Sequence, residues 1–238
     1  MLGVLYCVST LLFLSHQTMK NPDITDAALL WHRFATDEAL TETQVTQFKD
    51  YFNLLTEWNK RINITRIVTL PDVLAYHFSD SLEFGRHIPP KDHAATIIDV
   101  GSGGGFPGIP LAIKYPQMQI ILLEVTHKKV LFLEAVIKTL NLHNVTIDTR
   151  DWRTYLHHAQ TPVDYVCARA SLKVPDLMYV YTAHKRYTAT QVVYWASQNF
   201  VIPPSYISSV VHDYAYTVGE KKRRLIFFKK PAHPKDTI

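Results

Sequence analysis

The residues best suited to chemistry lie in the stretch 97–108, which reads Ile-Ile-Asp-Val-Gly-Ser-Gly-Gly-Gly-Phe-Pro-Gly and holds five of the chain's eight glycines. A short apolar run passes through Asp99 and leads directly into this glycine-rich loop. Glycine allows the backbone to turn sharply and lets a ligand approach where a side chain would collide. A helix that begins after the loop would add free backbone N–H groups. The stretch therefore predicts a loop that cradles a nucleotide-type cofactor.

The sequence of this loop is compatible with two cofactors. Residues 103–108 fit G-x-G-x-x-G, the dinucleotide fingerprint, but Pro107 and Pro110 bracket its end and leave fewer N–H donors for a pyrophosphate. A motif that begins at Gly101 instead places Asp99 two residues before its first glycine. An acid there would repel a phosphate but suits the cationic amino-acid end of S-adenosylmethionine. The residues favour S-adenosylmethionine, and a nicotinamide cofactor of an oxidoreductase is the alternative.

Further candidates follow the predicted strands, at the edge where ligands bind in such sheets. Glu124 ends the second strand, where a carboxylate can accept hydrogen bonds from two ribose hydroxyls; an ordinary acid at a strand end is the alternative. Asp151 and Trp152 follow the third strand and suit an adenine ring, or equally a helix N-cap and a packed tryptophan. Arg169 closes the fourth strand between small residues, which favours a role at the mouth of a cleft.

The elements that must position these residues change character near residue 96. Before it, apolar residues at three- and four-residue steps predict a helix over 41–62, and Pro71 suits the start of a second helix that runs through Leu82. After it, strands and helices alternate, and continuous apolar runs indicate strands covered on both faces, as in a parallel sheet. The expected strands are 96–100, 119–124, 145–150, 164–169, 191–196, 206–218 and 223–229, and the expected helices are 108–115, 128–140 and 172–185.

This order predicts an α/β protein with a mostly parallel seven-stranded sheet that closes with an antiparallel C-terminal hairpin. Class I S-adenosylmethionine-dependent methyltransferases commonly have this fold. We expect residues 19–90 to form a helical N-terminal part and residues 91–238 the methyltransferase domain, joined in one structural unit. Residues 1–18 are interpreted as an upstream extension from a misplaced start, with an ordinary packed segment as the alternative.

Composition and charge limit the cellular compartment and the kinds of partner that are expected for the protein. The chain has 238 residues, 47% of them apolar, which is enough to bury a substantial core. Cys7 and Cys167 form no metal or redox motif, and the apolar run 4–14 is too short to span a bilayer. A cytoplasmic protein without a membrane partner is therefore expected. The segment 219–238 holds seven basic and two acidic residues, which predicts either a nucleic-acid contact or a solvated edge strand.

Motifs spread over residues 40–230 extend the glycine pattern. They are Trp58-Asn59-Lys60, Asn63-Ile64-Thr65, His77-x-x-Asp80-Ser81, Asp99-Val100-Gly101-x-Gly103-x-Gly105-x-Pro107-Gly108-Ile109-Pro110-Leu111, Lys128-Lys129-Val130-x-Phe132-Leu133 and Arg169-Ala170. In these motifs the chain resembles the bacterial 16S rRNA guanine-N7 methyltransferases (RsmG, also called glucose-inhibited division protein B). One departure concerns the end of the fifth strand, where the family usually has a Lys-Gly pair and this chain has Ala196-Ser197-Gln198. Another basic residue would have to supply that charge.

The resemblance implies S-adenosylmethionine as the cofactor and 16S rRNA, or the small ribosomal subunit, as the partner; we expect the protein to be a monomer. The cofactor contacts it implies are Gly101, Gly103, Gly105, Phe106, Glu124, Asp151, Trp152 and Arg169. The substrate-positioning residues are Arg169 and Arg223, and the RNA contacts are Arg150, Lys221, Lys222, Arg223 and Arg224. The residues expected to line the cleft are Asn63, His77, Asp80 and Ser81. No metal site is expected, and Ser81 lacks the nucleophile elbow of a hydrolase.

The implied reaction requires alignment rather than proton transfer. Guanine N7 carries a lone pair and no proton, and the sulfonium of the cofactor is already activated. The enzyme must hold N7, the methyl carbon and the sulfur in line, so no general base is expected. Because N7 faces the deep, narrow major groove of duplex RNA, the target is expected in a loop or as a splayed base. Another RNA position or a small molecule is the alternative substrate.

Overall fold

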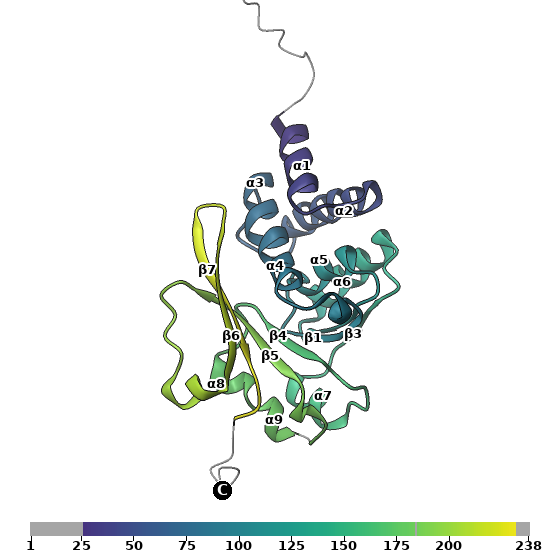
Figure 1. Ribbon diagram of the computed structural model, residues 1–238. Helices are drawn as coiled ribbons and strands as arrows, with labels where there is room; N and C mark the ends of the chain where they lie inside the picture. Colours follow the sequence, from purple (N-terminus) through teal and green to yellow (C-terminus); the bar gives the residue numbers. More distant parts are fainter. Residues whose placement is uncertain (1–25, 184, 232–238) are drawn as a thin grey trace, which may run out of the picture.

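The protein is built around a single seven-stranded sheet, described by a computed structural model for residues 26–183 and 185–231 (Figure 1). The strand order is β3-β2-β1-β4-β5-β7-β6. The first five strands pair in parallel, and β7 pairs antiparallel with both β5 and β6. The strands are β1 Thr96–Val100, β2 Gln119–Leu123, β3 Val145–Asp148, β4 Tyr165–Ala168, β5 Gln191–Ser197, β6 Val210–Val218 and β7 Lys221–Phe228. The predicted class I methyltransferase architecture is confirmed.

Alternate strand residues face two separate hydrophobic cores, one on each side of the sheet. Ile97 packs into a core with the helices α2 Glu42–Asn59, α4 Asp80–Arg86, α5 Gly108–Lys114 and α6 His127–Leu140. The neighbouring Ile98 packs into the other, with α7 Trp152–His158, α8 Val174–Leu177 and α9 Val180–Ala183. Because both faces are covered, the central strands are apolar on both sides, as the continuous apolar runs indicated.

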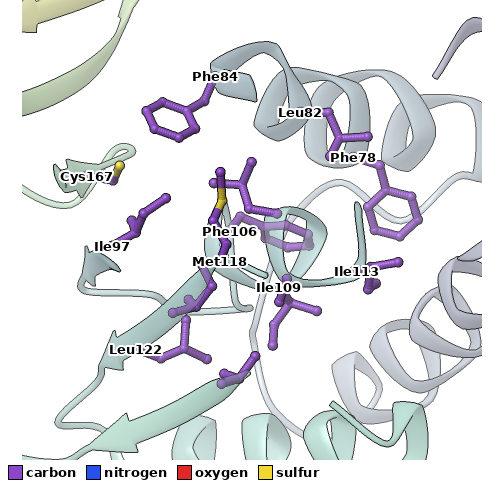
Figure 2. Packing of buried hydrophobic residues seen from close by; sticks show 14 of the residues in the cluster. Phe78, Leu82, Phe84, Ile97, Phe106, Ile109, Ile113, Met118, Leu122 and Cys167 are labelled. Carbon is purple, nitrogen blue, oxygen red and sulfur yellow. The ribbon is translucent and has the colours of Figure 1, made fainter. Parts of the chain in front are cut away.

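The N-terminal helices belong to the first of these cores. Thr41 and Gln44 form a capping box that begins α2, and the Gln44 amide also donates to the carbonyls of Ile113 and Lys114 at the end of α5. Figure 2 shows Phe78 and Phe84 projecting from the neighbouring helical segment into the side chains of the α/β part. The helical part and the sheet therefore share buried residues, which supports our proposal that residues 19–90 and 91–238 form one unit.

The first two predicted helices begin or end at other residues than expected. α2 ends at Asn59 rather than 62, because the Asn59 side chain accepts from the backbone N–H groups of Ile64 and Thr65 and so stabilises a turn. The second helix begins with the N-cap Thr69 and passes through α3 Leu70–Val73, a π-helical turn Leu74–Ser79 and α4. A π turn inserts an extra residue into the helical ladder, a feature frequent at functional sites.

Other elements were predicted with the wrong extent or not predicted. The helix expected over 172–185 is two short helices, α8 and α9, and the strand expected from 206 begins at Val210 after a 3-10 turn, Pro204–Ser209. α1 Asp26–Asp37 and the 3-10 turn Pro90–Ala94 were not predicted, and α7 was predicted only through the alternative that Asp151 is a helix N-cap. The interpretation of residues 1–18 lies outside the described residues. In the part of the chain that the structure describes, no helix is long and apolar enough to cross a membrane.

Candidate functional site

A cavity of about 810 Å³ lies at the carboxyl ends of the central parallel strands. It is bounded by the glycine loop after β1, by Glu124 after β2 and by Arg169 after β4, while the π turn and β7 close its other side. Five of its side chains are lysine or arginine and two are acidic, so the lining is positively charged. Its residues are Ile64, Thr65, Arg66, Ile67, Tyr76, His77, Asp80, Gly101, Ser102, Gly103, Gly104, Phe106, Glu124, Lys129, Arg169, Ala170, Ser171, Lys221 and Arg223.

The glycine loop needs glycine at defined positions. Gly101 and Gly103 have φ angles of +66° and +59°, in the left-handed region that other residues rarely adopt. A Cβ at Gly101 would also lie 2.8 Å from the Cβ of Ser171, whose hydroxyl donates to the carbonyl of Val100. At Gly103 the nearest atom that a Cβ would meet in the described part of the chain is the carbonyl oxygen of Gly101 at 3.8 Å, so this part of the loop is open. The loop therefore packs tightly against the β4 side and leaves its backbone accessible at Gly103.

Asp99 lies under the loop rather than in the cavity. Its side chain is fully buried, and one carboxylate oxygen accepts from the N–H of Gly108 at 3.0 Å, at the start of α5. The other oxygen has no hydrogen-bond partner among the described residues. Burial, the largest effect, raises the pKa of Asp99 to about 7. The inference that this acid faces a cationic ligand is thus not supported by its position, because it instead ties β1 to α5.

Glu124 faces the glycine loop across the cavity. Its two carboxylate oxygens accept from the backbone N–H groups of Gly103, at 2.9 Å, and Thr126, at 2.8 Å. The side chain is buried yet lines the cavity. These two contacts hold the carboxylate beside Gly103, with lone pairs left for ligand hydroxyls.

Asp80 brings two arginines from distant strands together. This fully buried carboxylate accepts from Nη1 of Arg169 at 2.6 Å, and its other oxygen accepts from the hydroxyl of Tyr216 at 2.7 Å and lies 3.4 Å from Nε of Arg223. Its backbone carbonyl accepts from the indole of Trp195. One negative charge is thus shared by two guanidinium groups, and the excess positive charge favours an anionic ligand.

His77 connects Arg169 to the segment after α2. Nη2 of Arg169 lies 2.8 Å from Nδ1 of His77, and Nε2 of His77 lies 2.8 Å from the hydroxyl oxygen of Thr65. The imidazole stacks on Phe106, with ring centres 4.2 Å apart. Burial and the charge of Arg169 lower the pKa of His77 to about 3, so the ring is neutral at physiological pH.

The C-terminal basic residues divide between two faces of β7, because neighbouring side chains of a strand point in opposite directions. Lys221 and Arg223 line the cavity, and Nζ of Lys221 lies 3.9 Å from the ring centre of Tyr76. Arg224 points to the other face, where it pairs with Asp213 and donates to the carbonyl of Phe200. The predicted basic patch is therefore not one surface.

Several predicted site residues do not line the cavity. Asp151 is the N-cap of α7, which confirms the capping interpretation, and Trp152 packs edge-on against Tyr179. Arg150 forms a paired contact with Asp148. Asn63 and Lys222 are exposed, whereas Gly105 and Ser81 are buried. A Cβ at Gly105 would strike Ile109, and the hydroxyl of Ser81 donates to the carbonyl of His77. Their roles in ligand binding stay proposals.

The sequence interpretation missed some lining residues. Thr65 and Lys129 stand inside the motifs that carried the family resemblance, so their positions were available as a signal. Arg66, Tyr76 and Ser171 carried no such signal, because only the tertiary fold brings their segments to the cavity. Among the described residues, no group of three or more histidine, cysteine or acidic side chains could hold a metal ion.

Comparison with solved structures shows a likeness of fold. A mutant of MtNAS in complex with S-adenosylmethionine matches with a TM-score of 0.50 and 16% identity, over 84% of this chain and 84% of that chain. At this identity the match concerns the fold alone.

Comparison with curated sequences finds proteins called ribosomal RNA small subunit methyltransferase G. The protein of Leuconostoc citreum is 46% identical over 109 residues, which cover 45% of this chain and 46% of the relative. That of Desulforamulus reducens is 41% identical over 58% of both chains. That of Francisella tularensis subsp. novicida is 38% identical over 62% of this chain and 68% of the relative. The matched part thus spans about half the length of the first two relatives.

A family model agrees with these relatives. The model described as rRNA small subunit methyltransferase G matches residues 44–198, from α2 to the end of β5. This range includes the glycine loop, Glu124, the His77–Asp80 segment and Arg169, and it stops before Arg223. The chain belongs to the rRNA small subunit methyltransferase G family.

Proposed function

We propose that the protein is an S-adenosylmethionine-dependent methyltransferase that methylates N7 of a guanine in 16S rRNA. The observation that carries the proposal is the juxtaposition of an open glycine loop, a carboxylate and two arginines in one cavity at the carboxyl edge of the sheet. Ligands bind at this edge in α/β folds. Membership of the family supports the reaction type and the ribosomal substrate.

The residues at the β1–β2 side fit S-adenosylmethionine. The left-handed turn at Gly101 and the open space at Gly103 form a cradle that a side chain would fill, and Glu124 offers carboxylate lone pairs next to it. Phe106, held flat against His77, supplies an apolar wall. When bound, S-adenosylmethionine supplies an activated methyl group on a sulfonium. The chain's own task is to hold and orient the two reactants and to exclude water.

The residues at the β4–β7 side suit an anionic acceptor. Arg169 and Arg223 share the single carboxylate of Asp80, and Lys221 lines the same cavity. Positive charge in excess of its buried counter-ion attracts RNA phosphates, with an affinity that falls as salt rises. Arg169 and Arg223 would position the nucleotide. The basic residues of β7 would supply the positive charge of the family's lysine, which this chain lacks after β5.

Of the residues that the structure describes in the cavity, His77 and Asp80 are both held by other contacts and are not arranged as general bases, which suits an acceptor atom without a proton. His77 is neutral, but Nδ1 already accepts from Arg169 and Nε2 contacts Thr65. The carboxylate of Asp80 accepts hydrogen bonds from Arg169 and Tyr216 and forms an ion pair with Arg223. We therefore expect alignment of N7 with the methyl carbon to be the main contribution of the site. We further propose that the protein works as a monomer in the cytoplasm, on the small subunit or its RNA.

The proposal is tested by methyl transfer to ribosomes. Small subunits and protein-free 16S rRNA from a strain that lacks the enzyme are incubated with tritiated S-adenosylmethionine, and the modified base is mapped. We expect label at one guanine N7. Calorimetry with S-adenosylmethionine and NAD separates this function from an oxidoreductase; tighter binding of NAD, or label at another position, would contradict it.

A further inference from the structure

Thr65 is a cavity residue whose hydroxyl has a fixed hydrogen-bond direction. The hydroxyl oxygen contacts two groups, Nε2 of His77 at 2.8 Å and the backbone N–H of Ile67 at 3.0 Å. The second group is a donor. The role of the first depends on which nitrogen of His77 carries the proton.

Arg169 decides the tautomer of His77. A guanidinium has only donors, so Nδ1 of His77, 2.8 Å from Nη2 of Arg169, must accept. A neutral imidazole that accepts at Nδ1 carries its proton at Nε2. The lowered pKa of His77 agrees with the neutral ring. Nε2 therefore donates to Thr65.

The hydroxyl of Thr65 thus receives two hydrogen bonds, which occupy both lone pairs of its oxygen. Its own hydrogen remains, and no acceptor for that hydrogen is found in the described ranges. Thr65 lines the same cavity as Gly104 and Phe106. The hydroxyl can only donate to a ligand, and it would meet another donor with repulsion.

The backbone of Thr65 is held equally firmly. Both N–H groups of Ile64 and Thr65 donate to Oδ1 of Asn59, and Nδ2 of Asn59 donates back to the carbonyl of Thr65 at 2.9 Å. Ile64 lies directly on the glycine loop, since a Cβ on Gly104 would come within 2.9 Å of its side chain. Such a preorganised donor costs little entropy when a ligand binds.

We propose that Thr65 is a positioning and specificity residue that donates a hydrogen bond to an acceptor oxygen of the bound reactants. The inference rests on the proposed function, which offers two such oxygens: the carboxylate of the methionine part of S-adenosylmethionine and the carbonyl O6 next to N7 of guanine. Adenine presents an amino donor in place of O6. A donor-only hydroxyl at that edge would discriminate against adenine.

The test combines variants with ligand analogues. Thr65→Val replaces the hydroxyl by a methyl group of similar size, and Thr65→Ser is the matched control that keeps the hydroxyl. Calorimetry compares S-adenosylmethionine with its decarboxylated analogue. Methyl-transfer kinetics compare RNA that carries guanine at the target with RNA that carries 2-aminopurine, which lacks O6. The melting temperature of each variant reports its effect on folding.

We expect the wild type and Thr65→Ser to prefer the ligand with the oxygen, and Thr65→Val to lose about tenfold of that preference in the arm to which the oxygen belongs. A merely structural threonine would change the melting temperature and leave both preferences unchanged, which would overturn the proposal. Wild-type protein that transfers no methyl group would instead refute the proposed function.

Discussion

Asp99 and His77 make opposite contributions to the pH dependence of stability. Burial raises the pKa of Asp99 from the ordinary 3.8 to about 7, so between these values the folded state binds a proton that the unfolded state lacks. Its contribution to stability therefore falls as pH rises. The pKa of His77 is lowered from the ordinary 6.5 to about 3, so there the unfolded state binds the additional proton, and its contribution rises with pH.

In the wild type, the pH-dependent contributions of Asp99 and His77 to the free energy of unfolding offset each other. A variant that lacks one of the two groups shows the contribution of the other alone. One proton of difference changes the free energy of unfolding by roughly 1.4 kcal/mol per pH unit. Asp99→Asn removes the contribution to stability that falls as pH rises. Between about pH 4.5 and 6.5 we expect its stability relative to the wild type to increase by about 3 kcal/mol. His77→Asn keeps an acceptor for Arg169 and removes the contribution that rises with pH. Over the same pH range, its stability relative to the wild type should therefore decrease by a similar amount.

The assay is urea unfolding followed by tryptophan fluorescence at several pH values, with variant and wild type in the same buffers. The difference between two proteins cancels the titration of all groups that they share. Arg224→Gln, on the outer face of β7, is the control and should give a difference independent of pH. A flat difference for Asp99→Asn would refute the reasoning, because it would mean that the Asp99 carboxylate titrates as it does in water.

The remaining predictions concern the ligand site. Gly101→Ala forces a left-handed alanine against Ser171, so we expect a loss of about 1–2 kcal/mol in stability and weaker S-adenosylmethionine binding in calorimetry; unchanged affinity would contradict the cradle. Arg223→Gln should lower kcat/KM for RNA about tenfold or more and reduce its salt dependence, whereas Arg224→Gln should have a much smaller effect. Equal effects would mean that the strand faces do not separate their roles. Asp151→Ser retains an N-cap, so we expect unchanged stability, and we expect lower S-adenosylmethionine affinity in calorimetry because the resemblance implies that Asp151 contacts the cofactor. Unchanged affinity would mean that Asp151 only caps α7.

Much of the site was predictable because the motif residues follow strands whose order sets one edge of the sheet. The glycine loop, Glu124 and Arg169 each come directly after a strand with a strong apolar pattern, and all three line one cavity. The identity of their neighbours was less predictable. Asp99 suits a cationic ligand by type and spacing, yet it points into the protein toward Gly108.

Local patterns failed where tertiary contacts outweigh them. The segment 172–185 is apolar at helical spacing but divides into α8 and α9. Similarly, four consecutive basic residues look like one patch in the sequence, but the pleat of β7 sends Arg223 to the cavity and Arg224 to Asp213.

The sequence by itself determined the sheet, the glycine loop and the family, because these depend on backbone requirements and apolar periodicity that act over short stretches. Only the tertiary structure decided which polar groups form hydrogen bonds and ion pairs with each other. Asp80 meets Arg169 and Arg223 across 89 and 143 residues of chain, and Thr65 obtains its donor role through His77 and Arg169. Such relations depend on distances of a few ångströms between segments that only packing brings together.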